Sequence, residues 1–180
     1  MRFFTGLGDD GTTDLLGARV AKDDPRIDAL GSLDETTSAI GLARSMATDN
    51  RVREGMVTVQ RDLYQIMAEL AFTPELRPAS YEFSQHRVDW LGAETDALAA
   101  RVDLPREFIL PGESTAGAAL DVARTVARRG ERQIVALSHA DHQVSATIVG
   151  YLNRLSSLLF VAARIEDRAA GSELKRAKAR

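Results

Sequence analysis

The residues with the clearest chemical potential are arginines repeated along one segment, LDVARTVARRGERQIVAL. Arg124, Arg128 and Arg132 are four residues apart, which places them along one stripe of a helix. Guanidinium groups bind phosphate oxygens two at a time, so such a stripe is suited to a polyphosphate. A solvated charged surface, with Asp121 and Glu131 as local partners, would show the same spacing, because surface charges are often inert.

The opposite face of this helix is small and apolar, which is typical of a face packed against a neighbour. Its residues are Ala116, Ala119, Leu120, Ala123, Ala127 and Ile134. A second polar feature is Asn153, which together with Arg154 interrupts the apolar stretch YLNRLSSLLFVAAR. Asparagine is disfavoured inside helices, so Asn153 is expected to be a cap, an exposed residue or a ligand-binding residue.

The amino-terminal stretch FFTGLGDDGTTDLL, residues 3–16, is rich in glycine and polar side chains. It carries no apolar stripe that would anchor it to a core, so simple disorder is one interpretation. A segment that serves a ligand is the other, and the rest of the sequence bears on the choice.

Hydrophobic periodicity predicts five helices that would position these residues. Their expected ranges are 25–47, 52–70, 88–102, 114–137 and 144–162, with Ser114 as the N-cap of the fourth. No alternating pattern of useful strand length is present. Long helices joined by short loops predict an all-α, antiparallel five-helix bundle. The polar tail GSELKRAKAR is expected to fray.

Composition limits the possible functions. A length of 180 residues fits one domain, and a net charge of -3 provides no global field for nucleic acid. The absence of cysteine excludes disulfides, thiolate metal sites and cysteine nucleophiles. No signal sequence and no apolar run long enough for a bilayer are expected, which predicts a cytoplasmic protein without a membrane partner.

Other motifs carry less weight. No GxxxxGK[ST] sequence is present, and GLGDDG lacks the preceding strand of a dinucleotide fingerprint. DDGTTD lacks the later glutamate of a calcium loop. A metal site at His86, His139 and His142 is disfavoured, because no further ligand lies nearby in the sequence.

Five motifs together resemble the PduO-type ATP:corrinoid (cob(I)alamin) adenosyltransferases. They are GDDGTT, RVAKDDPRIDALGSLDETTSAIGLA, FILPGES, ARTVARRGERQIVAL and YLNRLSSLLF, and they occur in the family's order from Phe4 to about Arg164. Each motif is weak alone, whereas five in order are specific.

The resemblance implies a trimer with active sites between adjacent subunits. The implied reaction transfers the 5′-deoxyadenosyl group of ATP to the cobalt of reduced cob(I)alamin, which forms adenosylcobalamin and releases triphosphate. It also implies one domain over residues 1–180: a nucleotide-binding segment at 1–24 that orders over ATP, a helical bundle at 25–168 and a polar tail at 169–180. An adenosylcobalamin-dependent mutase or a flavoprotein reductase is a possible partner.

The resemblance also assigns roles to individual residues. The ATP contacts would be Thr5, Gly8, Thr12, Thr13, Lys22, Arg128, Glu131, Arg132 and Asn153, with Mg²⁺ held through the phosphates. Asp34 and Arg124 would form an ion pair across the subunit interface. Phe108 would occupy the lower face of cobalt and, with Arg128 and Asn153, serve catalysis.

The sequence departs from the family pattern at several positions. Gly6 and Leu7 stand where the family has lysine and threonine, and Ser157 stands where it has a carboxylate. Two alternatives therefore remain open: a carrier or sensor that binds nucleotide or corrinoid without turnover, and a bundle whose arginines serve only trimer contacts.

Overall fold

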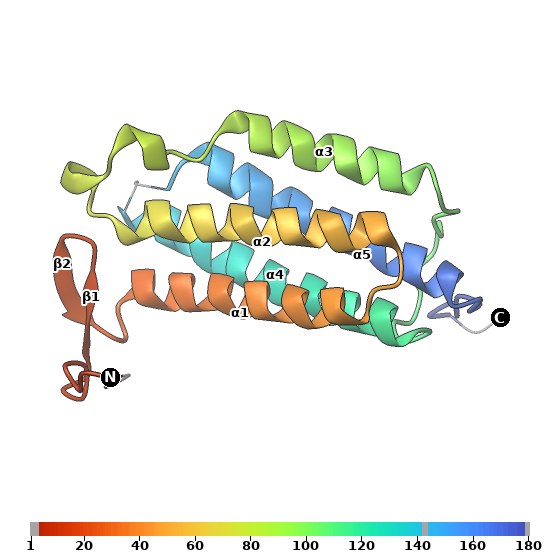
Figure 1. The fold of residues 1–180 in the computed structure, drawn as a ribbon, viewed down its shortest axis with the longest axis horizontal. Coiled ribbons are helices and arrows are strands. Elements are labelled where there is room, and N and C mark those ends of the chain that lie inside the picture. Colours follow the sequence, from red (N-terminus) through yellow and green to blue (C-terminus); the bar gives the residue numbers. More distant parts are fainter. Residues whose placement is uncertain (1–3, 142–143, 179–180) are drawn as a thin grey trace.

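The computed structural model describes residues 4–141 and 144–178, and its main body is an antiparallel bundle of five long helices (Figure 1). The helices are α1 (Pro25–Met46), α2 (Asn50–Ala71), α3 (Gln85–Ala99), α4 (Thr115–Asp141) and α5 (Ala146–Ala169). Two short 3₁₀ helices, η1 (Pro74–Leu76) and η2 (Ala79–Tyr81), lie between α2 and α3. The predicted all-α bundle is thus confirmed.

Side-chain caps explain where most of these helices begin. Asp24 accepts a hydrogen bond from the Arg26 N–H, and Pro25 occupies the first helical turn of α1. The predicted cap of α4 is also present, because Ser114 Oγ accepts from the Gly117 N–H at 2.9 Å. These local signals explain why the expected helix starts agree closely with the structure.

The helices pack through their apolar faces, with α4 lying between α1 and α5. The small face expected for α4 is buried at Leu120, Ala123, Ala127 and Ile134. Gly130 belongs to the same face, and a Cβ there would contact Thr36 Oγ1 at 3.4 Å. Because these side chains are small, α1 approaches α4 closely, and the larger polar residues of α4 remain on the outside.

The amino-terminal segment contains a hairpin that the sequence did not predict. β1 (Thr12–Leu15) pairs antiparallel with β2 (Ala18–Ala21). The turn between them is held by α2, since the Leu16 N–H donates to the Ala71 carbonyl and the Thr73 N–H donates to the Leu16 carbonyl. The expectation of no strand is therefore wrong, because strands of four residues are too short to produce a clear alternation and depend on this tertiary contact.

The carboxyl-terminal tail also differs from expectation. After α5, residues 172–177 lie along the loop before α4, and Arg176 pairs with Ile109 in an isolated antiparallel bridge. The expected fraying is therefore wrong for these residues. By length and composition α5 could span a bilayer, contrary to the sequence expectation, but half of that window is buried in the bundle, as in the core helix of a globular fold.

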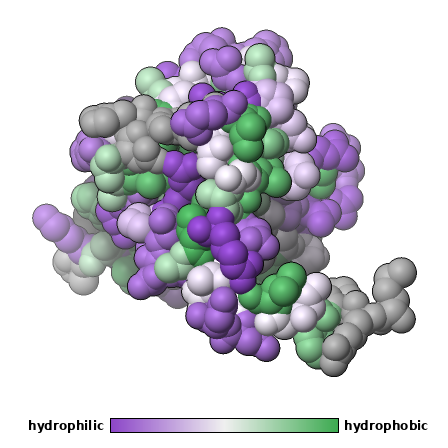
Figure 2. Space-filling model, turned by 90° about the vertical axis from the view of Figure 1, so that its left-hand side faces the viewer, coloured by the Kyte–Doolittle hydropathy of each residue, from purple (hydrophilic) through white to green (hydrophobic). Residues whose placement is uncertain are grey.

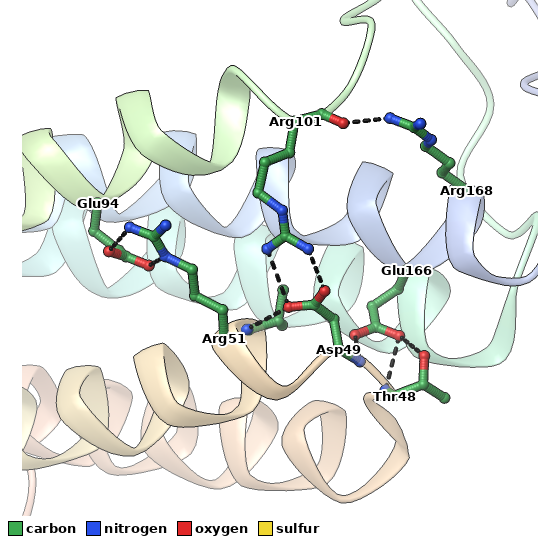
Figure 3. A network of polar contacts seen from close by, with 8 residues as sticks. Thr48, Asp49, Arg51, Glu94, Arg101, Glu166 and Arg168 are labelled. Atoms are coloured by element: carbon green, nitrogen blue, oxygen red, sulfur yellow. Dashed lines mark hydrogen bonds and ion pairs between the residues drawn. The ribbon is translucent and has the colours of Figure 1, made fainter.

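A polar network fixes the end of the bundle where α1 turns into α2 (Figure 3). The buried Glu166 of α5 accepts hydrogen bonds from the Thr48 N–H, the Thr48 hydroxyl and the Asp49 N–H. Asp49 in turn caps α2 and pairs with Arg101, which follows α3. The hydrogen bond from Arg101 lowers the pKa of Asp49 below its usual value.

Candidate functional site

The predicted arginine stripe lies on the outer face of α4. Arg124 is held by Asp121 at 2.9 Å, and Arg128 lies 3.8 Å from Glu131. The side chain of Arg128 is 50% exposed. Within the part of the chain that the structure describes, Arg132 makes no side-chain hydrogen bond or ion pair. The local acidic partners therefore engage Arg124 fully, Arg128 weakly and Arg132 not at all.

Helix α5 brings Asn153 next to this stripe. Arg128 Nη1 lies 3.5 Å from Ser156 Oγ, and Ser156 Oγ donates to the Asn153 carbonyl at 3.2 Å. Asn153 is exposed, so its amide is available to a ligand. The structure thus combines an amide and guanidinium groups from two neighbouring helices, as the separate sequence motifs predict.

The glycine-rich segment folds into tight turns before the hairpin. Gly6 and Gly11 have φ angles of 75° and 81°, values that favour glycine. Lys22 reaches back over this segment, since a Cβ added to Gly8 would lie 3.2 Å from Lys22 Nζ. A primary amine and closely spaced backbone N–H groups are therefore brought together, which suits an anion.

The hydroxyl residues of the segment have different surroundings. Thr5 Oγ1 accepts from the Leu7 N–H at 3.3 Å, and the Thr12 hydroxyl donates to Asp10 at 2.6 Å. Hydrogen bonds from Thr12 lower the pKa of Asp10 below its usual value. Thr13 is half-buried on β1. Thr5 and Thr12 therefore shape the loop in this conformation.

One residue in this segment was missed from the sequence. Arg19 on β2 donates to Asp14 at 2.9 Å, lies 3.5 Å from Asp10, and also donates to the Leu7 carbonyl. It therefore ties the hairpin to the glycine-rich turns. Its partner Asp14 is opposite it in the hairpin register, so only a correct strand prediction could have identified the pair.

The hairpin lies toward the end of the bundle to which Arg132, the last arginine of the stripe, is nearest. Because α1 and α4 are antiparallel, Asp28 in the first turn of α1 accepts from Gln133 Nε2 at 2.7 Å. Lys22 directly precedes α1, and Arg132 is adjacent to Gln133 in the sequence. Figure 2 views the molecule from this end and shows hydrophilic residues interspersed with smaller hydrophobic areas.

Phe108 lies at the other end of the bundle, in the loop between α3 and α4 (Figure 1). Its side chain is 90% exposed, which is unusual for a phenylalanine. It borders a pocket of about 380 Å³, with Phe160 and Pro111 as further apolar residues and Arg124 as the start of the cationic stripe. Charged side chains also line it, namely Arg106, Glu107, Asp121 and Arg164, so a pocket of mixed polarity adjoins the arginine stripe.

A buried ion-pair network supports the wall of this pocket. Arg164 Nη2 lies 2.6 Å from Asp121 and 2.9 Å from Asp167, and all three side chains are almost fully buried. Asp121 also binds Arg124, and Asp167 accepts from Ser114 at 2.7 Å. The network thus fixes the first arginine of the stripe and the start of α4 against α5.

The expected ion pair between Asp34 and Arg124 is not formed within a single chain. Asp34 is exposed on α1, and within the described residues its side chain makes no hydrogen bond or ion pair, while Arg124 is occupied by Asp121. No group of three or more potential metal ligands occurs in residues 4–141 and 144–178. His142 lies outside the described residues.

The family model and the curated relatives that match this chain point to the same family. A family model described as cobalamin adenosyltransferase matches residues 3–166. A corrinoid adenosyltransferase of Bacillus subtilis is 35% identical over 95% of this chain and 89% of its own length. The corrinoid adenosyltransferase PduO of Salmonella typhimurium is 40% identical over 93% of this chain, which spans only 50% of that relative.

The fold comparison agrees. A phenylalanine-to-alanine variant of a PduO-type ATP:corrinoid adenosyltransferase from Lactobacillus reuteri, solved with cobalamin and ATP, superposes with a TM-score of 0.89. The sequence identity is 30%, and the match covers 99% of this chain and 100% of the other. Sequence and fold therefore agree over nearly the whole length, and the chain belongs to the cobalamin adenosyltransferase family.

Proposed function

We propose that this protein is a cytoplasmic ATP:corrinoid adenosyltransferase. Cobalt(I) of the reduced corrinoid attacks the 5′ carbon of ATP, so that a cobalt–carbon bond forms and the bond from that carbon to the triphosphate oxygen breaks. The electron pair leaves with the triphosphate. The observation that carries the proposal is the incompletely neutralised stripe of Arg128 and Arg132 beside Asn153, which suits a polyanionic leaving group.

The nucleotide would lie between the glycine-rich segment and the stripe. Thr5, Gly8, Thr12, Thr13 and Lys22 would surround the phosphates from the segment, with Gly8 allowing close backbone approach. The stripe and Asn153 would bind from the helices and stabilise charge as it develops on the leaving group. Glu131 would orient Arg128, and Mg²⁺ would be held through the phosphates.

The corrinoid would lie against Phe108. An exposed aromatic ring at the edge of a pocket that holds both apolar and charged side chains is suited to a large ligand with an apolar face and a polar rim. Occupation of the lower face of cobalt by this ring would displace the axial base, which makes reduction to cobalt(I) easier. The electron could come from a flavoprotein reductase, and an adenosylcobalamin-dependent mutase would receive the product.

The geometry favours an assembly of several chains. Helix α4 has 27 residues, so it is about 40 Å long, and Phe108 and the hairpin lie at opposite ends of the bundle. A site that combines Phe108 with the glycine-rich segment therefore needs two copies. We propose a homotrimer, the assembly that the family resemblance implies, in which a head-to-tail contact that closes forms a ring and Asp34 of one copy faces Arg124 of the next.

The proposal is tested by anaerobic incubation with chemically reduced cobalamin and Mg-ATP. The visible spectrum should show the cobalt–carbon product, and triphosphate should accumulate in equal amount. Arg128→Ala should abolish both signals while the fold is retained. Binding of ATP and corrinoid without either product would support the alternative of a carrier or sensor, to which Gly6 and Leu7 point.

A further inference from the structure

The loop that carries Phe108 is paired with the carboxyl-terminal tail. The Leu110 N–H donates to the Lys175 carbonyl at 2.8 Å, and the Ala177 N–H donates to the Phe108 carbonyl at 2.8 Å. These bonds flank the bridge between Ile109 and Arg176. The tail therefore adds a short antiparallel strand to the loop.

Side chains reinforce the same register. The Ser172 hydroxyl donates to the Glu113 carbonyl at 2.8 Å, and Lys175 Nζ lies 3.5 Å from the Glu113 carboxylate. Arg176 lies 3.4 Å from Glu107. Exposed ion pairs such as these contribute little alone, so the backbone bonds and the Ser172 bond are the main restraints.

The tail supplies most of the order that this loop receives. From residue 103 to residue 113, all backbone–backbone hydrogen bonds in the described part of the chain go to residues 175 and 177. Phe108 cannot be fixed by its own packing, because its side chain is 90% exposed. The direction of the Phe108 ring therefore depends on the backbone conformation of the loop, and the hydrogen bonds to the tail hold that conformation.

The tail itself starts from a rigid base. It follows α5 directly, and Ser172 N–H donates to the Asp167 carbonyl at 3.0 Å. The Asp167 side chain is buried against Arg164 and accepts from Ser114, so the same residue also holds the start of α4. The start of the tail and the start of α4 are thus both bound to the buried network of Arg164 and Asp167.

We infer that residues 172–177 form a positioning element that holds Phe108 against the corrinoid. The inference rests on the proposed role of Phe108 at cobalt. The tail acts through the loop and does not contact the reacting atoms. Loss of the tail should therefore impair the formation of four-coordinate cobalt(II) and the turnover number, while ATP binding at Arg128 and Arg132 is retained.

The test compares the intact chain with Ala177→Pro, which removes the N–H that binds Phe108, and with a chain ending at Gly171. Lys178→Pro is the matched control, because in the described part of the chain its N–H makes no backbone hydrogen bond. The readouts are amide exchange at Leu110, the spectrum of cobalt(II) corrinoid with Mg-ATP, ATP affinity and turnover.

In Ala177→Pro, we expect exchange at Leu110 to rise and four-coordinate cobalt(II) to fall by about 2- to 12-fold, the equivalent of one hydrogen bond. The chain that ends at Gly171 should form still less four-coordinate cobalt(II), and Lys178→Pro should resemble the intact protein. ATP affinity should remain within about 2-fold in all of them, since no hydrogen bond or ion pair of residues 172–177 with the described residues involves Arg128, Arg132 or the hairpin.

Phe108→Ala separates the two possible failures. If it leaves the cobalt(II) spectrum unchanged, the proposed role of Phe108 is wrong and the inference falls with it. If Phe108→Ala removes the four-coordinate signal but both tail variants behave like the intact chain, the inference alone is overturned. Equal losses of ATP affinity, thermal stability and turnover in the tail variants would show a general structural role, which also overturns it.

Discussion

At the scale of single residues, the arginines of α4 are distinguished by their partners. Arg124 is neutralised by the buried Asp121, and Arg129 pairs with Glu35 of α1. Among the residues that the structure describes, Arg128 has only Glu131 at 3.8 Å and the Ser156 hydroxyl at 3.5 Å. A guanidinium with such weak intrachain contacts keeps its capacity for a bidentate anion, so the ligand-binding interpretation is favoured most at this residue.

Arg128→Lys should therefore reduce adenosylation strongly. Lysine keeps the charge but loses the planar fork that binds two oxygens. The expected loss of transition-state stabilisation is about 2–4 kcal/mol, as for removal of an oxyanion donor. Turnover kinetics with Mg-ATP and reduced cobalamin measure it.

Arg129→Lys is the matched control on the same helix. Its pair with Glu35 is solvent-exposed, so turnover and the midpoint of thermal unfolding should change little. Thermal unfolding of Arg128→Lys should also resemble that of the unchanged protein, because its side chain is half exposed. Equal activity of both variants would mean that the stripe is a solvated surface.

At the scale of elements, the hairpin depends on its contact with the end of α2. Gly17 has a φ angle of 114°, and an added Cβ would lie 2.6 Å from Thr73 Oγ1 and 2.7 Å from Leu76 Cδ1. Gly17→Ala should therefore destabilise the docked hairpin by about 1–3 kcal/mol. Faster amide exchange at Leu16 and weaker ATP binding are the expected results.

Gly11→Ala is the control for backbone strain alone. Its φ angle is 81°, but a Cβ there meets nothing within 4 Å. Exchange at Leu16 should therefore respond less than in Gly17→Ala. If the two variants affect Leu16 equally, backbone strain and not contact with α2 controls hairpin docking.

The capping network at the start of α2 predicts a pH dependence. The Arg101 hydrogen bond lowers the pKa of Asp49 in the folded chain, so this pair stabilises the fold above the unfolded pKa of about 3.9. That stabilisation is lost as the pH falls through the lower, folded pKa. Asp49→Asn should lower the free energy of unfolding by about 0.5–1 kcal/mol near neutral pH. On the acid side, its free energy of unfolding should fall less steeply with decreasing pH than that of the unchanged protein.

Denaturant unfolding at a series of pH values measures this effect. Asp103→Asn is the control, because Asp103 is exposed in the loop after α3 and its side chain makes no hydrogen bond or ion pair with the described residues. An acid limb in Asp49→Asn as steep as that of the control would show that the network in Figure 3 does not contribute to acid stability.

At the scale of the whole molecule, the open question is assembly. We expect light scattering at micromolar concentration to give three times the mass of one chain. Arg124→Ala should weaken this trimer if Arg124 meets Asp34 of a neighbour, and a charge left buried without its partner costs about 3–5 kcal/mol. Within one chain Asp121 would keep Arg164, so the monomer fold should survive.

Arg61→Ala is suited as the control for the assembly experiment. Arg61 is exposed on α2, and its side chain makes no hydrogen bond or ion pair with the residues that the structure describes. Its removal should leave the trimer unchanged. A mass of one chain for the unmodified protein would contradict the proposed assembly, whatever the variants show.

The helical bundle was predictable from the sequence, and the site residues stay a prediction that rests on residue type and spacing. Helix starts were predicted to within about three residues because they depend on local caps such as Asp24 and Ser114 and on apolar spacing within one helix. The ends of α4 and α5 lie beyond the predicted ones, at Asp141 and Ala169. The arginine stripe and Asn153 were also readable, since residue type and a four-residue spacing fix a helix face without knowledge of the partner.

The partners of these residues and the positions of the non-helical segments depend on contacts between distant parts of the chain. The hairpin depends on backbone bonds between Leu16 and the end of α2, and the tail depends on bonds to Phe108 and Leu110. Both pairings join segments about 55 or more residues apart. Backbone hydrogen bonds of this kind leave no pattern in side-chain type, so no reading of the sequence alone could place the tail beside Phe108.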